Sequence, residues 1–476
     1  MREARASDHR RRACTRPYPV ALEHFRFANV PALGSNEVTL GPGPTLVCGG
    51  NGVGKSSLLQ AIYSTLSGRA PRSPRALRRL DGGEFWARVR TPAGEIVRHA
   101  RIESGAVIAD GPDVPSGVVF LDLGVTCPEW LTLLARTANL DELLASLAPA
   151  ISARDALDEV CYLVGKDYVE RLVYEIDELG EDSIPYFNVR TSAAQYASED
   201  MGLGELALHV LYWQLSSAPQ NSIVLIEEPE TFASPRSQRA LVDLVCKYCE
   251  TRGLCVVITS HSLGIVGRLP IGHVRLLFQG GTGAGVVTPP RPHQLNEVLG
   301  VPVRPVALLL VEDDAARMLT ALLIDKLDPD LRFVVQVQPV DGADGINAAL
   351  KGFPENQLIR LVGVYDGGYE VNATGHHWPH VNLPGADGPE RTLRQALAGR
   401  TRDLAVLARR DEEDVEIALG TVEGFDDHDW ARALAERLAI SIDRLFEHLL
   451  DVWLSVGANR DAANRFCSEV KGLVHG

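Results

Sequence analysis

The hydrophobic pattern of this 476-residue chain switches repeatedly between the periods of strands and helices. Residues 18–47 predict short strands broken by turns, and residues 55–66 predict a helix. Alternating apolar and polar residues within 68–103 predict hairpins. Over residues 129–180, apolar positions three and four apart predict mostly helix. Four further elements are predicted in order: a helix over 203–215, a strand over 223–226, a helix over 238–250 and a strand over 255–258. Strands alternating with helices predict a mainly parallel α/β sheet.

A second α/β pattern follows a stretch rich in Gly and Pro, residues 279–305, which we interpret as a domain boundary. Its predicted elements are a strand over 306–311, a helix over 315–327, a strand over 333–340, a short helix, and a strand over 361–365. The predicted organisation is a basic N-terminal arm (1–19), a first α/β domain (20–300) with a helical insertion at about 129–200, a second α/β domain (301–385) and a helical, acidic C-terminal extension (386–476).

Charge is distributed unevenly along the chain. The net charge is −15, from 47 basic and 62 acidic residues. Residues 1–101 alone carry +10, so the remainder carries −25, and the total charge does not exclude a polyanionic partner such as DNA. No apolar run is long enough to span a membrane, no secretory signal is recognisable, and eight Cys are too few for a disulfide scaffold. These features predict a protein of the reducing cytoplasm.

Residues 49–56, GGNGVGKS, match the phosphate-binding loop pattern GxxxxGK[ST] between a predicted strand and a predicted helix. Glycines let backbone N–H groups surround the phosphates of ATP, and the helix start adds its positive dipole end. Lys55 is expected to reach the β- and γ-phosphates and the Ser56 hydroxyl to bind Mg²⁺. The residues predicted to contact the nucleotide in this loop are Gly49, Asn51, Gly52, Gly54, Lys55, Ser56 and Ser57.

The acidic half of such a site follows the apolar strand at 223–226, in the sequence EEPE. We assign Glu227 to the metal and Glu228 to the attacking water. About thirty residues later another strand ends in Ser-His-Ser, and we predict that His261 contacts the γ-phosphate.

These motifs, GGNGVGKSS, LIEEPE and TSHS, resemble those of ABC-type ATPases of the DNA-repair and SMC-like branch over residues 20–290. The resemblance implies a signature loop that caps the ATP of a partner subunit, and hence a homodimer or higher oligomer formed through the ATPase heads. The candidate signature is residues 201–205, with Gly204 and Glu205 as nucleotide contacts; Gly202 stands where the family usually has Ser. The alternative is a plain helix cap. The Q-loop glutamine of the family has no evident counterpart.

A second group of acids follows two strands of the second α/β domain. Because acids at the carboxyl ends of neighbouring parallel strands converge on one crevice, these carboxylates suit a hard cation such as Mg²⁺ or Mn²⁺. The candidate ligands are Glu312, Asp313, Asp314, Asp366 and Glu370. The alternative is a pair of ordinary acidic loops.

This region resembles a Toprim domain, in which a Glu follows the first strand (here Glu312) and a DxD follows a later one (here Asp366-Gly-Gly368). An ATPase followed by a Toprim domain resembles the OLD family of ATP-dependent endonucleases, which implies that Glu312 and Asp366 are catalytic. Two departures weaken the match: Gly368 replaces the second Asp, and Ala316 stands where many OLD nucleases carry another acid. Asp313, Asp314 or Glu370 are the candidates to compensate.

A dense basic stretch lies within the predicted ATPase head, and we hypothesise that it contacts DNA phosphates. Its members are Arg69, Arg72, Arg75, Arg78 and Arg79. The alternative is a set of structural ion pairs. The resemblance thus implies a nucleotide-controlled, metal-dependent DNA endonuclease of bacterial anti-phage defence. Two alternatives remain open: an ATPase sensor or scaffold whose inactive Toprim domain regulates a separate effector, and a DNA-repair ATPase without a defence role.

Overall fold

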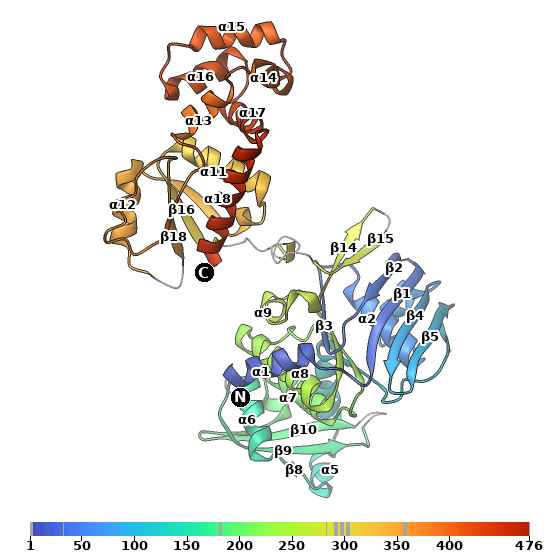
Figure 1. The fold of residues 1–476 in the computed structure, drawn as a ribbon. Coiled ribbons are helices and arrows are strands. Elements are labelled where there is room, and N and C mark those ends of the chain that lie inside the picture. The colour runs from blue at the N-terminus through green and yellow to red at the C-terminus, as the bar shows by residue number, and fades with distance from the viewer. Residues whose placement is uncertain are drawn as a thin grey trace. The chain divides into compact units, whose positions relative to one another are not determined.

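A computed structural model describes residues 3–31, 33–179, 183–281, 283–289, 294–295, 299–300, 305–355 and 359–475. The chain divides into two compact units, Met1–Val301 and Pro302–Gly476, which are described separately (Figure 1). The division falls in the Gly- and Pro-rich stretch 279–305, part of which lies outside the described residues. No helix of the described residues has the length and apolar character needed to cross a membrane.

The centre of unit 1 is a six-stranded sheet in the order β15-β14-β3-β13-β12-β7. Its strands are β3 (Pro44–Cys48), β7 (Val118–Asp122), β12 (Ile223–Glu227), β13 (Cys255–Ser260), β14 (Val274–Gly280) and β15 (Gly283–Val287). All neighbours pair in parallel except β15, which runs antiparallel to β14. Because parallel strands are covered on both faces, β3 and the apolar run of β12 are buried throughout.

A second, antiparallel sheet has the order β2-β1-β4-β5-β6. Its strands are β1 (Ala21–Val30), β2 (Gly34–Thr39), β4 (Glu84–Thr91), β5 (Gly94–Glu103) and β6 (Ala106–Asp110). Helix α2 (Lys55–Ser67) contacts both sheets and is buried along almost its whole length (Figure 1). The short helix α3 (Pro74–Leu80) follows it, and further along the described chain lie α8 (Pro235–Arg252) and α9 (Leu263–Val266).

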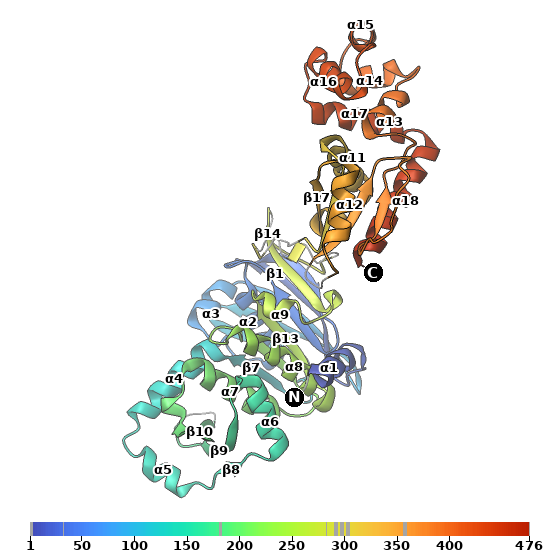
Figure 2. The same cartoon turned by 90° about the vertical axis from the view of Figure 1, so that its left-hand side faces the viewer.

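The insertion after β7 is only partly helical. Its elements are α4 (Leu123–Arg136), α5 (Leu140–Ser146), β8 (Ala150–Ile151), α6 (Arg154–Val164), β9 (Tyr168–Ile176), β10 (Ile184–Thr191), β11 (Gln195–Ala197), the 3-10 turn η1 (Ser198–Asp200) and α7 (Leu203–Ser217). Strands β8 to β11 form an antiparallel sheet with α4, α5 and α6 around it (Figure 2). The prediction of a helical insertion over about 129–200 is therefore wrong for its second half. The sequence YVERLVYEI is rich in β-branched and aromatic residues, which favours a strand.

The basic N-terminal segment forms a helix, α1 (Glu3–Thr15), that packs on α8. Arg10 pairs with the fully buried carboxylate of Asp243, which also accepts hydrogen bonds from Tyr162 (2.8 Å) and Arg268 (2.7 Å). Arg12 pairs with Glu250. Much of the positive charge predicted for an arm is thus used within the unit.

Unit 2 contains a four-stranded parallel sheet in the order β17-β16-β18-β19. Its strands are β16 (Ala307–Val311), β17 (Val335–Pro339), β18 (Arg360–Tyr365) and β19 (His380–Asn382). Helix α12 (Gly342–Gly352) packs on one face of the sheet, and α11 (Asp314–Leu327) and α18 (Gly457–His475) pack on the other (Figure 1).

The other helices described in unit 2 are α13 (Pro389–Ala396), α14 (Thr401–Ala408), α15 (Glu412–Val422), α16 (Asp427–Arg437) and α17 (Ile442–Leu454). Two further short 3-10 turns are η2 (Ile271–His273), which lies in unit 1, and η3 (Leu331–Phe333), which lies in unit 2. The C-terminal helices share one hydrophobic core with the sheet. The predicted helical extension is therefore not separate from the second α/β domain, because its apolar faces complete the core of that domain.

Candidate nucleotide and metal sites

The phosphate-binding loop connects the buried strand β3 to α2. Gly54, the N-cap of α2, has φ +104°, and Gly52 has φ +77°, conformations that favour glycine. At Gly49 a Cβ atom would lie 2.3 Å from the carbonyl oxygen of Leu277 on β14. The glycines thus let the chain turn tightly and pass close to the neighbouring strand, as a phosphate cradle requires.

Lys55 is buried, and its ammonium group lies within the loop. Its Nζ donates hydrogen bonds to the carbonyl oxygens of Gly49 and Gly50, both at 3.1 Å, and lies 3.4 Å from Glu228 Oε1. A phosphate in the loop would offer this ammonium a stronger, charged acceptor.

Glu227 ends β12 beside the first turn of α2. Its carboxylate accepts hydrogen bonds from Ser56 and from Gln60 Nε2, the latter at 3.3 Å. Burial raises the pKa of Glu227, against the effect of these hydrogen bonds. A hydroxyl oxygen and a carboxylate side by side are hard ligands suited to Mg²⁺, so Ser56 and Glu227 fit the assigned metal position.

A third carboxylate, Asp122, was missed from the sequence. It ends β7 directly opposite Glu227 in the register of the parallel sheet, at the point where the insertion begins. Burial raises the pKa of Asp122, and the charge of Glu228 raises it further. Its Oδ1 accepts a hydrogen bond from the N–H of Val125 (3.2 Å) and so caps α4. The sequence VVFLD, like the one that ends in LIE, is an apolar strand that ends in an acid. This pattern could have identified Asp122 from the sequence.

Glu228 and His261 lie together after β12 and β13. Glu228 has the positive φ of +35°, held by two hydrogen bonds from its N–H to Thr259, at 3.1 and 3.2 Å. His261 Nδ1 lies 3.6 Å from Glu228 Oε1 and 3.5 Å from Glu230 Oε1. The structure therefore brings the assigned water-activating acid and the assigned γ-phosphate contact to one edge of the sheet.

Glu230, which was given no role from the sequence, holds the loop next to Glu228 and His261. It is 6% exposed, and its Oε1 accepts hydrogen bonds from Ser260 Oγ (2.6 Å) and the N–H of His261 (2.9 Å). Its carboxylate thereby fixes the loop that carries His261. The second oxygen, Oε2, is buried and has no hydrogen-bond partner within the described part of the chain.

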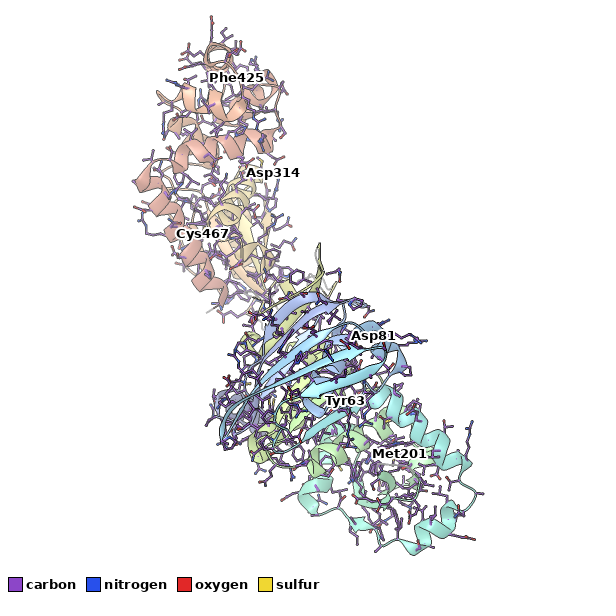
Figure 3. The ribbon with its side chains drawn as sticks, turned by 90° about the vertical axis from the view of Figure 1, so that its right-hand side faces the viewer. Tyr63, Asp81, Met201, Asp314, Phe425 and Cys467 are labelled. Carbon is purple, nitrogen blue, oxygen red and sulfur yellow. The ribbon has the colours of Figure 1, made fainter. Side chains whose placement is uncertain are left out.

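The candidate signature loop opens α7, with Met201 before it (Figure 3). Gly202 is the N-cap and is exposed, whereas a Cβ at Gly204 would lie 2.3 Å from the carbonyl oxygen of Phe232. Gly204 is thus required by packing against the loop that follows Glu228 in the same chain.

The carboxylate of Glu205, predicted as a nucleotide contact, is used within the insertion. It pairs with Lys166 and accepts hydrogen bonds from the hydroxyls of Tyr168 and Tyr196, both at 2.6 Å. Burial opposes ionisation, but these three donors lower the pKa of Glu205 overall. Its side chain joins β9 and β11 to α7, and we infer a structural role for it.

In unit 2, Glu312 and Asp366 follow the neighbouring parallel strands β16 and β18 and lie together. The N–H of Asp366 donates a hydrogen bond to Glu312 Oε1 at 3.0 Å. Burial, together with the charges of Glu312, Asp313 and Glu390, raises the pKa of Asp366 to about 7. Asp366 Oδ1 is buried and has no hydrogen-bond partner among the described residues.

The other predicted ligands of this site behave differently from one another. Asp313 caps α11 by accepting the N–H of Ala316 (2.8 Å) and is close enough to influence Asp366. Asp314 pairs with Arg317 at 2.9 Å and is 77% exposed, on the surface of unit 2 (Figure 3). Glu370 is exposed and is not among the charges that act on Asp366. Asp314 and Glu370 are thus both exposed, whereas Asp313 lies near Asp366.

The carboxylate that joins Glu312 and Asp366 instead is Glu390, in the first turn of α13. Burial raises the pKa of Glu390, and His428 Nδ1 lies 3.2 Å from its Oε1. Two residues before it, the backbone of Gly388 passes so close that a Cβ there would lie 2.9 Å from Asp366 Oδ2. The segment LPGADGPE therefore reaches the site, although no residue of it was assigned a role from the sequence.

The same segment explains Gly368. This residue has φ +74°, and a Cβ atom on it would lie 2.3 Å from the carbonyl oxygen of Ala386. The second Asp of a DxD motif has no room in this conformation. Across the described residues, no three His, Cys, Asp or Glu side chains are already arranged around a metal position.

The five candidate DNA-contacting arginines lie in and before α3, and all are exposed. Arg72 is placed over the ring of Tyr63, 5.7 Å from its centroid. No ion pair joins Arg69, Arg75, Arg78 or Arg79 to an acid in the part of the chain that the structure describes. The alternative of structural ion pairs thus applies to the later arginines, such as Arg88 with Glu95 and Arg90 with Glu23, and not to these four.

Comparisons with known proteins support the first unit only. A family described as "AAA domain, putative AbiEii toxin, Type IV TA system" (AAA_21) matches residues 45–267, which contain all the residues assigned to the nucleotide. Unit 1 therefore carries an α/β P-loop ATPase domain similar to that family. No curated protein matches the sequence. The OLD and Toprim assignments remain predictions, since unit 2 lies outside the matched residues.

Solved structures with a similar fold include heads of SMC proteins. One is an SMC head bound to the C-terminal winged-helix domain of ScpA, at 14% identity and a TM-score of 0.41, covering 56% of this chain and 97% of that chain. The SMC head domain from Thermotoga maritima matches at 11% identity and a TM-score of 0.35, over 56% and 98% of the two chains. A head from Pyrococcus yayanosii matches at 10% and 0.42, over 59% and 99%.

Proposed function

We propose that the protein is an ATPase whose second unit cleaves DNA in a divalent-cation-dependent reaction controlled by nucleotide. The ATPase part is supported by the P-loop, by the pairing of Ser56 with Glu227 and by the family match over residues 45–267. The nuclease part is carried by one observation: Asp366 lies against Glu312, and one of its carboxylate oxygens is buried with no hydrogen-bond partner among the described residues.

In the head, each residue has a defined task toward Mg²⁺-ATP. Ser56 and Glu227 would hold the metal, which when bound screens the phosphate charge. Lys55 leaves the loop carbonyls for the phosphates, and this frees Glu228 from its ion pair. Glu228 then accepts a proton from water, while His261, held by Glu230, donates a hydrogen bond toward the terminal phosphate.

In the second unit, Glu312, Asp366 and Glu390 would hold Mg²⁺ or Mn²⁺, which when bound activates water and stabilises the leaving oxygen of a phosphodiester. His428 orients Glu390 through the 3.2 Å contact. Glu390 thus takes the place of the acid missing at Gly368.

We place two heads together in the active form, because the N-cap Gly202 is exposed and the start of α7 has backbone N–H groups to offer to a second nucleotide. The description of the matched family names a toxin and a type IV toxin–antitoxin system, and a role in bacterial defence would agree with it.

The decisive experiment is a plasmid-nicking assay with Mg²⁺ or Mn²⁺, with and without ATP. We expect metal-dependent nicking that falls at least 100-fold in Glu312→Ala and in Glu390→Gln. The matched control is Asp314→Asn, an acid two residues from Glu312 that points to solvent and should leave nicking unchanged. Nicking that survives in Glu312→Ala would contradict the proposed site.

One observation favours a second function, an ATPase sensor or scaffold that regulates a separate effector. The packing at Gly368 removes one metal ligand, and no preassembled cluster of three ligands is present in the described residues. Wild-type protein that hydrolyses ATP but nicks no DNA with either metal would establish this alternative over the nuclease.

A further inference from the structure

A cavity of about 320 Å³ lies in unit 1 at the open edge of the six-stranded sheet. Its floor is β7, which has β12 as its only strand neighbour among the described residues. Its walls come from α2, which follows the P-loop, and from α4 and α7 of the insertion. Neither the ATPase assignment nor the acids of unit 2 give this cavity a role.

Aromatic side chains line much of the cavity. The indoles of Trp130 on α4 and Trp213 on α7 meet edge to face, with centroids 6.5 Å apart. Tyr63 of α2, marked in Figure 3, lies 5.2 Å from the ring of Phe120 on β7. Trp130 and Trp213 are only half-buried, so ring surface remains available to a flat ligand.

The polar groups of the cavity favour a ligand with a phosphate. Arg69 and Arg72 line it and are exposed, and no acid pairs with Arg69 in the described residues. On the other wall, the Oγ atom of Ser183 is buried and has no hydrogen-bond partner among the described residues. Aromatic rings beside guanidinium groups are the combination by which proteins bind single-stranded nucleic acids.

We propose that this cavity binds one unpaired base of single-stranded DNA, with the adjoining phosphates on Arg69 and Arg72. The strand continues onto Arg75, Arg78 and Arg79, exposed side chains of α3, the helix that directly follows Arg69 and Arg72 in the chain. This continuation distinguishes a nucleic acid from a free nucleotide, which would need no cations beyond the cavity. The inference deepens the proposed function by placing part of its DNA on the head.

The position of the cavity couples such a ligand to the ATPase site. Asp122 lines the cavity and stands next to Glu227, and Gln60, which binds Glu227, also accepts the N–H of Arg72 at 2.9 Å. A bound base therefore lies one side chain away from the metal-holding acid.

The test is the affinity of the full-length protein for fluorescein-labelled oligothymidylate of about 20 nucleotides, measured by anisotropy in EDTA without ATP. We expect at least tenfold weaker binding for Arg69→Ala/Arg72→Ala and for Trp130→Ala, because base stacking contributes about 1–3 kcal/mol. Trp130→Phe should retain most of the affinity. The control, Arg88→Ala/Arg101→Ala, removes the same charge from exposed, ion-paired arginines and should stay within twofold.

Two results would overturn the proposal. One is an equal loss of affinity in the control and in Arg69→Ala/Arg72→Ala, which would mean that charge alone acts. The other is binding of free thymidine monophosphate at the same affinity as the oligonucleotide. If the Trp130→Ala variant fails to fold, the Arg69→Glu variant, which changes an exposed side chain, is tested in its place. Because metal and ATP are absent, a protein that binds but never cleaves would refute the nuclease and leave this inference standing.

Discussion

Two carboxylate groups in this protein occupy equivalent places in their sheets and have opposite surroundings. In the head, Glu227 and Glu228 follow a buried parallel strand and are matched by Lys55, His261 and the amide of Gln60. In unit 2, the charges that act on Asp366 are all carboxylates. The acids of the first site thus have a cationic or hydrogen-bonding partner beside them, whereas Asp366 in the second site lies in an excess of negative charge.

This difference indicates what each site is built to receive. In the head, the buried ammonium of Lys55 lies in a glycine-rich loop, where it and the N–H groups of the loop can bind an anion such as a phosphate. A site in which Asp366 keeps a proton until about pH 7 is stabilised by a cation that replaces the proton. The same topological position, the carboxyl end of a parallel strand, thus serves opposite ligands.

The largest effect that would test this contrast concerns the head. Glu228→Gln keeps the shape of the side chain and removes its ability to accept a proton, so ATP hydrolysis should fall about 100- to 10,000-fold while ATP binding persists. Single-turnover hydrolysis and nucleotide affinity measure the two effects. Glu103→Gln, an exposed acid of β5, is the control. Unchanged hydrolysis would exclude Glu228 as the acid that activates water.

The next effect concerns the packing that removes the DxD motif. Gly368→Asp must adopt φ +74° and meet the carbonyl of Ala386, so we expect a loss of about 3 kcal/mol in the free energy of unfolding. Gly375→Asp has a similar φ, +81°, with no heavy atom near its Cβ, and should lose only about 1 kcal/mol. Denaturant unfolding measures both. Equal losses would show that the loop 385–387 moves easily and that an Asp at position 368 is tolerated.

A smaller effect is the pH dependence of metal binding by unit 2. Since a cation must displace the proton of Asp366, Mn²⁺ affinity should rise about tenfold per pH unit below pH 7 and level off above it. Because the pKa of Asp366 is raised by folding, its contribution to stability is present at low pH and is lost as the pH rises through about 7. Mn²⁺ titrations and thermal unfolding, each compared with Asp366→Asn, check both expectations. A flat affinity from pH 5 to 8 would contradict the charge excess.

The smallest effect tests the signature loop. Gly202→Ser restores the residue that the family usually carries, and no atom lies near the added Cβ. As an N-cap, Ser should stabilise α7 by a few tenths of a kcal/mol. Gly204→Ala, whose Cβ would meet the Phe232 carbonyl, should instead destabilise by about 1–3 kcal/mol. Thermal unfolding separates the two, and equal shifts would show that the packing at Gly204 is not limiting.

The sequence was sufficient to predict candidate site residues where a short polar motif directly follows an apolar strand. The P-loop, the strand ending in Glu227 and the Ser-His-Ser segment each combine an apolar strand with a short polar motif, and the structure brings them to one edge of a sheet. Glu312 and Asp366 were predictable for the same reason, because they end neighbouring parallel strands.

What the sequence did not predict depends on contacts between distant segments. Glu390 joins Asp366 only because Gly367 and Gly368 let the segment 385–388 pack against them. The strand β9 was mistaken for helix because its apolar residues satisfy both periods over a short stretch. Helix α1 was expected as an arm because Asp243, the partner of Arg10, lies far along the chain.

The close packing at Gly368 also has a consequence for recognising related proteins. Glu390 lies 24 residues after Asp366 in the sequence. The two segments that carry these acids pack closely at two glycines, Gly368 in the first segment and Gly388 in the second. A pattern that demands DxD would overlook such a chain, whereas Asp-Gly-Gly followed at a similar interval by Gly-x-Glu describes it. In this arrangement a larger side chain at position 368 and the segment that leads to Glu390 exclude each other, because the carbonyl oxygen of Ala386 lies where the Cβ atom would be.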